Sequence, residues 1–182
     1  MRKMTILWKM LGVIALGALA GPVAAELPVD ARAPVFATQA ALAGKETGFS
    51  LSAALARGPV VLYFYPKAFT QGCTLEANAF AEAMDQFAAM GATVIGLSAD
   101  DIDTLKEFSV LECRNAFPVG VASAELIKAY DVSLVREGKD LGVTSRTSYV
   151  IAPNGRIAMV HSDMDYRDHV RLSLEAVKKL AR

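Results

Sequence analysis

Cysteine is scarce in this 182-residue chain, which has only Cys73 and Cys113. Neither belongs to a Cys-x-x-Cys pair, because residue 70 is threonine and residue 76 is glutamate. A dithiol–disulfide oxidoreductase normally needs such a closely spaced pair, so this class is disfavoured. Three interpretations of Cys73 remain open: a small buried hydrophobe, half of a structural disulfide with Cys113, or a nucleophile.

The chain also lacks a block of basic residues and a set of residues spaced as metal ligands. Lys and Arg together number 19, as do Asp and Glu, and this balance argues against a nucleic-acid partner. Its two histidines, His161 and His169, have no metal-ligand spacing to either cysteine, which argues against a copper-chaperone-like site. Both histidines are interpreted as ordinary surface residues or as hydrogen-bonded ones.

The apolar stretch near the N-terminus is short for a membrane span. Residues 10–25 are uncharged, follow a start with three basic residues, and fall short of the roughly 20 apolar residues that a spanning helix needs. We therefore predict a signal peptide over residues 1–25, cleaved near Ala25, and one domain over residues 26–182. An uncleaved anchor is the alternative. Export to an oxidising periplasm, with membrane contact only during export, would let a structural disulfide persist.

Hydrophobic periodicity predicts the elements of the domain. Residues 26–47 show little periodicity and are expected to form an extended lead-in. Residues 59–66 form an apolar run typical of a strand buried on both faces. Over 73–91 the apolar residues recur every three or four positions, which predicts an amphipathic helix. Asp100 is predicted to cap the next helix, with Asp103 in its first turn.

The rest of the chain continues this alternation of strands and helices. We expect a strand over 92–99, a strand over 117–123, a helix over 124–131, a loop or weak hairpin over 133–145, a hairpin over 146–163 around Asn154-Gly155, and a helix over 166–182. Right-handed crossovers make the early strands parallel, and the hairpin adds antiparallel strands. This order predicts an α/β, thioredoxin-like fold with a mixed central sheet flanked by helices on both faces.

Cys73 falls at the start of a predicted helix that follows a buried strand. The free N–H groups and positive dipole end of a helix stabilise a thiolate, which is the nucleophilic form of cysteine. Thr70 offers a hydroxyl that donates and accepts hydrogen bonds, and Pro66 would help to keep water away. Glu76 lies one turn beyond Cys73, either at the edge of the apolar stripe or as a solvated acid.

The segment YFYPKAFTQGCTLEA resembles the active-site segment of the peroxiredoxins. Their pattern of Pro, three residues, Thr, two residues and Cys fits Pro66, Thr70 and Cys73. The residues of this segment also resemble those of the bacterioferritin-comigratory-protein branch, also called peroxiredoxin Q. SRTSYVIAPNG resembles the family's Arg-Ser-Thr-Phe segment and places Arg146 at the position of the active-site arginine. The resemblance runs from about residue 31 to the C-terminus and includes AFPV and KAYDV.

The resemblance implies a thiol-dependent peroxidase without a metal or other cofactor. Cys73 would attack hydrogen peroxide or an organic hydroperoxide and become a sulfenic acid. Arg146, the Thr70 hydroxyl and the Cys73 backbone N–H would stabilise the charge on the leaving oxygen, and Arg146 would lower the pKa of Cys73. A thioredoxin-like protein or another thiol would be the reductant, and a monomer is expected.

Two positions depart from the family pattern. Gln71 stands where a second proline is common, and Asn78 stands where many members of the branch carry the resolving cysteine. Cys113 is then the resolving candidate, and the first turn of the Cys73 helix would have to unwind for a bridge to form. The alternatives are a one-cysteine mechanism with an external thiol, or a structural Cys73–Cys113 disulfide without peroxidase activity.

Overall fold

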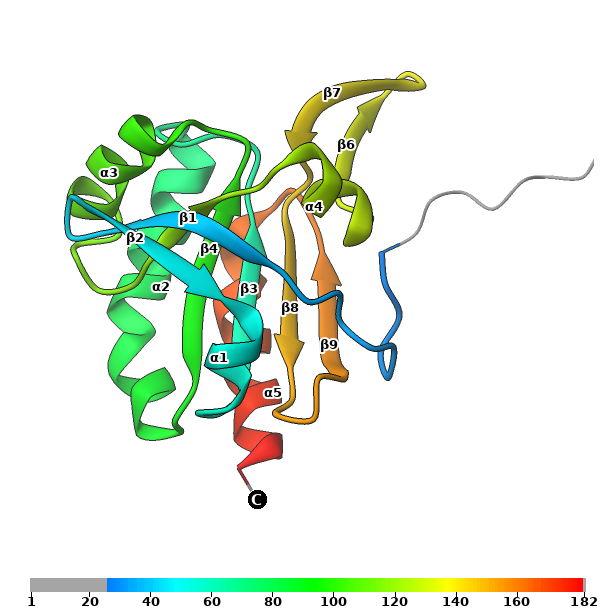
Figure 1. The fold of residues 1–182 in the computed structure, drawn as a ribbon. Coiled ribbons are helices and arrows are strands. Elements are labelled where there is room, and N and C mark those ends of the chain that lie inside the picture. The colour runs from blue at the N-terminus through cyan, green and yellow to red at the C-terminus, as the bar shows by residue number, and fades with distance from the viewer. Residues whose placement is uncertain (1–25, 182) are drawn as a thin grey trace, which may run out of the picture.

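The computed structural model describes residues 26–181, which fold around a seven-stranded sheet (Figure 1). The strands occur in the order β2-β1-β5-β4-β3-β8-β9. Their bounds are β1 (Ala37–Leu42), β2 (Lys45–Ser50), β3 (Val60–Phe64), β4 (Thr93–Ser98), β5 (Val119–Val121), β8 (Thr147–Ile151) and β9 (Ile157–Ser162). Strands β3, β4 and β5 are parallel, and antiparallel strands extend the sheet on both sides. The predicted mixed sheet is confirmed.

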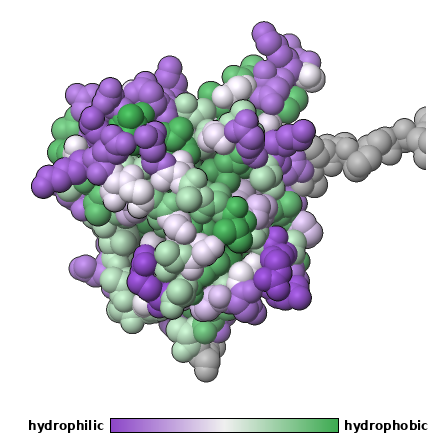
Figure 2. All heavy atoms as spheres, in the orientation of Figure 1, coloured by the Kyte–Doolittle hydropathy of each residue, from purple (hydrophilic) through white to green (hydrophobic). Residues whose placement is uncertain are grey.

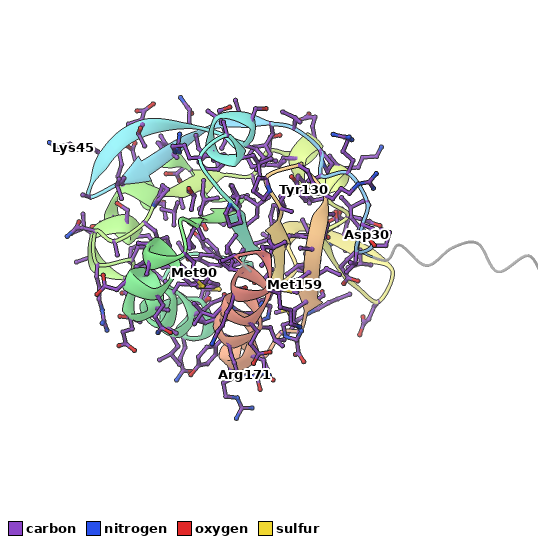
Figure 3. The ribbon with its side chains drawn as sticks, turned by 90° about the horizontal axis from the view of Figure 1, so that it is seen from below. Asp30, Lys45, Met90, Tyr130, Met159 and Arg171 are labelled. Atoms are coloured by element: carbon purple, nitrogen blue, oxygen red, sulfur yellow. The ribbon has the colours of Figure 1, made fainter. Side chains whose placement is uncertain are left out.

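Helices cover both faces of this sheet and enclose two apolar cores. The helices are α1 (Leu51–Leu55), α2 (Gln71–Ala89), α3 (Ile102–Leu111), α4 (Ala124–Ala129), the 3-10 turn η1 (Tyr166–Asp168) and α5 (His169–Leu180). One core contains buried residues of α2, α3 and α5, and the other contains those of α1 and α4. Helices α2 and α5 pack side by side, as the view from below shows (Figure 3). The prediction of helices on both faces is confirmed.

The central strands are apolar because both of their faces are covered. All five residues of β3 are buried, as are five of the six in β4. In the parallel register of these strands Tyr63 lies beside Gly96, and the Tyr63 ring stacks on Phe80 of α2 with centroids 4.3 Å apart. A Cβ atom on residue 96 would lie 2.6 Å from Cζ of Tyr63, so glycine leaves the space that this ring occupies.

The N-terminal hairpin was not predicted, because residues 26–47 were expected to form only an extended lead-in. Strands β1 and β2 pair in antiparallel register from Ala37–Ser50 to Leu42–Lys45, and β1 also pairs with β5. Alanine is a poor strand former, and three of the six β1 residues are alanine. Pairing with β5 overrides this weak local preference.

The cap of α3 also differs from the prediction. Its N-cap is Asp101, whose side chain accepts a hydrogen bond from the backbone N–H of Thr104, while Asp103 lies in the first turn as predicted. Asp100 instead accepts hydrogen bonds from the Ala68 backbone N–H at 2.7 Å and from the Ser98 hydroxyl at 2.9 Å. Asp100 therefore fixes the loop that connects β3 to α2.

A two-stranded hairpin projects from the body of the molecule, where a loop or weak hairpin was predicted. It consists of β6 (Ser133–Arg136) and β7 (Lys139–Thr144). Hydrophilic side chains gather at its tip (Figure 2). The second predicted hairpin, β8 and β9, is also confirmed, and Gly155 in its connection has a φ of 80°.

The predicted signal peptide, residues 1–25, lies outside the described residues. Within residues 26–181 no helix combines the length and hydrophobicity of a bilayer span. The same part of the chain contains no group of three or more His, Cys, Asp or Glu side chains arranged to hold a metal ion.

Gly96→Ala tests the packing of Tyr63 against β4. The added methyl group would displace a fully buried ring that is stacked on Phe80, and we expect the free energy of unfolding to fall by about 1–3 kcal/mol. Gly48→Ala in β2 is the matched control, because nothing lies within 4 Å of a Cβ atom at that position. Urea unfolding measures both variants, and equal stabilities would contradict the packing argument.

Candidate active site

Cys73 lies in the first turn of α2, directly after the loop that leaves the carboxyl end of β3. The residue is 1% exposed and its thiol is free. The helix N-cap is Thr70, whose side chain does not cap the first turn. The unpaired N–H groups at the helix start therefore favour negative charge near Cys73, as the sequence predicted.

Arg146 lies beside Cys73, although 73 positions separate the two in the sequence. One guanidinium nitrogen, Nη2, donates to Cys73 Sγ at 3.5 Å, and Nε donates to the Met164 carbonyl at 3.0 Å. The side chain is 4% exposed. Burial lowers the pKa of Arg146, but the negative charges of Glu76 and Cys73 outweigh it and raise that pKa above its ordinary value. Arg146 therefore brings a permanent positive charge to the sulfur.

Glu76 is fully buried and is hydrogen-bonded to Arg146. The Nη1 group of Arg146 donates to Glu76 Oε2, so Glu76 is not the solvated acid that was one of its two interpretations. Residues 73 and 76 share one face of α2 because they are three positions apart. Burial raises the pKa of Glu76 to about 8, even though the charge and hydrogen bond of Arg146 lower it.

His169, at the start of α5, lies on the far side of Glu76. Its Nδ1 is 2.8 Å from the Ser148 hydroxyl and its Nε2 is 2.9 Å from the Asp163 carbonyl oxygen. A carbonyl oxygen only accepts, so Nε2 carries the proton and Nδ1 accepts from Ser148. Burial lowers the pKa of His169 to about 4, a shift to which His161 and Arg146 contribute. The interpretation of His169 as a hydrogen-bonded residue is correct, but its place beside the site was missed.

Gly72 is a second residue that the sequence reasoning missed. A Cβ atom at this position would lie 3.0 Å from Nη2 of Arg146. The absence of a side chain therefore lets the guanidinium approach the start of α2 closely. Its place immediately before Cys73 was the signal that could have identified it.

Thr70 and Pro66 lie on the loop before α2. The Thr70 side chain is exposed, and its hydroxyl donates to the Lys67 carbonyl at 2.9 Å. Pro66 is half-buried and lies two residues after the end of β3. The structure thus brings Arg146 to the sulfur, while the Thr70 hydroxyl is bonded within its own loop.

Cys113 lies two residues beyond the end of α3 and is also a buried, free thiol. It belongs to the same apolar core as Cys73. Burial raises the pKa of Cys113 far above its ordinary value, so this thiol is protonated at neutral pH. Asn78 of α2 donates to the carboxylate of the adjacent Glu112 at 3.1 Å. The residue at the usual resolving position therefore holds the Cys113 segment against α2.

Glu76→Gln tests which effect controls the buried carboxyl group. Folded Glu76 keeps its proton up to about pH 8, whereas the unfolded chain loses it near the ordinary value of 4.5. The folded state binds more protons in between, so stability falls as pH rises, by at most about 1.4 kcal/mol per pH unit. Urea unfolding from about pH 5 to about pH 8 should show wild type losing stability relative to Glu76→Gln. A relative gain would mean that the ion pair dominates.

Comparison with known proteins identifies the family. The family model described as AhpC/TSA matches residues 29–160. Peroxiredoxin Bcp of Bacillus subtilis and peroxiredoxin Bcp of Escherichia coli are each 30% identical over 124 residues, which cover 67% of this chain and 79% and 80% of those proteins. These relatives bear the name of the branch that the segment around Cys73 resembles.

Solved structures of peroxiredoxins are also similar to this chain. Peroxidoxin BcpB from Mycobacterium tuberculosis superposes with a TM-score of 0.74 at 28% identity, covering 84% of this chain and 97% of that one. Peroxiredoxin Q from Xanthomonas campestris gives a TM-score of 0.69 at 29% identity, covering 79% and 91%. The likeness confirms the predicted thioredoxin-like fold. The chain therefore belongs to the AhpC/TSA family and is a peroxiredoxin, a thiol peroxidase similar to the Bcp and peroxiredoxin Q proteins.

Proposed function

We propose that Cys73 is the nucleophile of this peroxidase and that it reduces hydrogen peroxide, organic hydroperoxides or both. The observation that carries this proposal is the Arg146 guanidinium 3.5 Å from the buried Cys73 sulfur. A cysteine that served only as packing would need no buried cation, because an unpaired charge is expensive to bury. The Cys73 thiolate would compensate that charge, and hydrogen bonds to Glu76 and to the Met164 carbonyl keep Arg146 in place.

The chemistry follows from this arrangement. The Cys73 thiolate attacks one peroxide oxygen, a sulfur–oxygen bond forms and the oxygen–oxygen bond breaks. Sulfur loses two electrons, and the leaving oxygen departs as hydroxide or alkoxide and takes up a proton. Negative charge moves from sulfur to that oxygen, so a fixed cation beside both atoms lowers the barrier. Arg146 is the donor for this step, and Thr70 joins it when its hydroxyl turns away from Lys67.

Cys113 is the proposed resolving residue. Its thiol would attack the Cys73 sulfenic acid, release water and form a disulfide. Such a bond requires Cα atoms within about 7 Å and matching side-chain directions. Both thiols are buried and Cys113 is protonated, so the first turn of α2 and the segment after α3 must open. The Asn78–Glu112 hydrogen bond and the Arg114–Glu82 ion pair at 3.1 Å are the contacts that opening would break.

The reductant and the substrate range rest on similarity. One structure of the Xanthomonas campestris bacterioferritin comigratory protein is described in terms of alkyl peroxide reduction, and this supports including organic hydroperoxides here. A thioredoxin-like protein or another thiol would return the oxidised cysteine to its reduced form. We further propose a monomer in the periplasm, the location that the basic and apolar sequence of residues 1–25 supports.

Cys73→Ser tests the nucleophile. With dithiothreitol as reductant, peroxide consumption by residues 26–182 should fall to the rate of dithiothreitol alone, because a serine hydroxyl forms no sulfenic acid. Cys113→Ser is the matched control, since dithiothreitol can reduce a sulfenic acid directly and turnover should persist. Equal rates for Cys73→Ser and wild type would favour a structural role for the cysteine.

Peptide mapping tests the resolving step. One equivalent of peroxide added to the reduced protein should produce an intramolecular Cys73–Cys113 disulfide, detected in a non-reducing digest. Cys73 found only as sulfenic or sulfinic acid would contradict this route and support a one-cysteine mechanism with an external thiol. Asn78→Ala should speed disulfide formation, because it removes the hydrogen bond to Glu112.

A further inference from the structure

Four ionisable side chains form one buried chain of contacts at the site. Cys73, Arg146, Glu76 and His169 are each at most 4% exposed. Arg146 contacts both Cys73 and Glu76, and His169 Nδ1 lies 3.7 Å from Glu76 Oε1. Water screens charges poorly in such a place, so the total charge of the four groups governs how many protons they hold.

The hydrogen bonds leave one oxygen of this cluster without a partner. Glu76 Oε1 is buried and has no hydrogen-bond partner among the described residues. Its neighbour, His169 Nδ1, already accepts from Ser148 and presents no proton to it. An ionised Glu76 would therefore face the lone pair of a neutral imidazole. One added proton, on the carboxyl or on Nδ1, removes this unfavourable contact.

The charge of the cluster depends on the state of Cys73. The charges of a Cys73 thiolate and the Arg146 cation cancel. The cluster is then neutral in two cases: when Glu76 is protonated and His169 is neutral, or when Glu76 is ionised and His169 is protonated. Once Cys73 is a sulfenic acid or a disulfide, the sulfur is uncharged. The cluster is then neutral when Glu76 is ionised against Arg146 and the extra proton has left. A buried net charge is unfavourable, so the two states of sulfur favour different numbers of protons.

We propose that Glu76 and His169 are a redox-linked proton site, which holds one proton while Cys73 is a thiolate and gives it up when Cys73 is oxidised. The inference rests on the proposed role of Cys73. The step balances: the thiolate loses two electrons to the peroxide, and the leaving oxygen gains one proton. The pair loses one proton at the same time. The protein thus supplies the proton that the reaction consumes, and no net uptake from the solvent is needed.

Other titratable groups face the pair from several elements. They are Cys73 of α2, Tyr63 of β3, Arg146 before β8, His161 of β9, and Asp163 and Asp165 after β9. Asp163 and Asp165 are exposed, so solvent screens their charges. Burial raises the pKa of Tyr63 well above its ordinary value and keeps its hydroxyl neutral. Arg146 and the sulfur therefore dominate the charge that the pair experiences.

The pKa values of the two residues agree with this assignment. Burial raises the pKa of Glu76 to about 8 and lowers that of His169 to about 4, so the proton resides mainly on Glu76 near neutral pH. The pair titrates as a unit because its members interact closely. Linkage is reciprocal: if oxidation of the sulfur expels the proton from the pair, then loss of that proton favours the oxidised sulfur over the thiolate.

Counting protons during a single turnover tests the proposal. Reduced protein is mixed with one equivalent of hydrogen peroxide in weakly buffered solution near pH 7, and an indicator dye reports proton uptake. Ultraviolet absorbance verifies the initial thiolate. Disulfide formation consumes no further proton, so Cys113 does not alter the count. Wild type should take up close to no proton per oxidised Cys73, whereas Glu76→Gln should take up about one, the full requirement of the reaction.

Asp85→Asn is the matched control, because Asp85 is an exposed acid on the same helix and should behave as wild type. Infrared difference spectra of the wild-type protein give a second measurement that needs no variant. The carbonyl band of a protonated carboxylic acid should disappear on oxidation. Wild-type uptake of one proton, an unchanged carboxyl band, or a protonated Cys73 thiol at the start would each overturn the proton site. Failure of peroxide to oxidise Cys73 would instead overturn the proposed function.

Discussion

The hydrogen-bonded contact between Arg146 and Glu76 is the interaction on which the rest of the site depends. The two residues are 70 positions apart and meet in the core, where the Arg146 charge needs a negative partner, either the Cys73 sulfur or ionised Glu76. Helix α2 supplies the carboxyl group, the segment before β8 supplies the guanidinium, and α5 closes the far side with His169. A cation can approach the Cys73 sulfur only when these elements have assembled, so the positive charge beside this cysteine is a property of the folded domain.

Burial of the two cysteines has opposite effects on the two steps of the proposed cycle. The first step gains from a dry, fixed environment in which a guanidinium acts strongly on a thiolate. The second requires Cys73 to reach a sulfur that is equally buried and protonated. Different contacts serve the two steps. Glu76 holds Arg146, whereas the part-buried Asn78–Glu112 hydrogen bond and the exposed Arg114–Glu82 ion pair hold the Cys113 segment. The contacts of the Cys113 segment can open while the Arg146–Glu76 contact persists.

The sequence predicted the elements with strong hydrophobic periodicity and missed those that depend on tertiary contacts. The all-buried β3 and the helix after Cys73 follow from local pattern, as does the placement of the cysteine between them. The β1–β2 hairpin has no such pattern. For the site, motif spacing indicated Cys73 and Arg146, but spacing along the chain does not reveal that His169 of α5 lies 3.7 Å from Glu76 of α2. That contact arises only from the packing of the two helices.

Tyr63 and Gly96 show how packing in the core restricts which residues can replace one another near the site. The tyrosine ring occupies the space that a side chain at residue 96 would fill, and it stacks on Phe80 from the same helix as Cys73. Residues 63 and 96 are therefore expected to change together during evolution. A larger residue at 96 is compatible with the fold only when residue 63 becomes smaller. If the two positions change one at a time, the intermediate protein is either overpacked or has a cavity in the core that also contains Cys73.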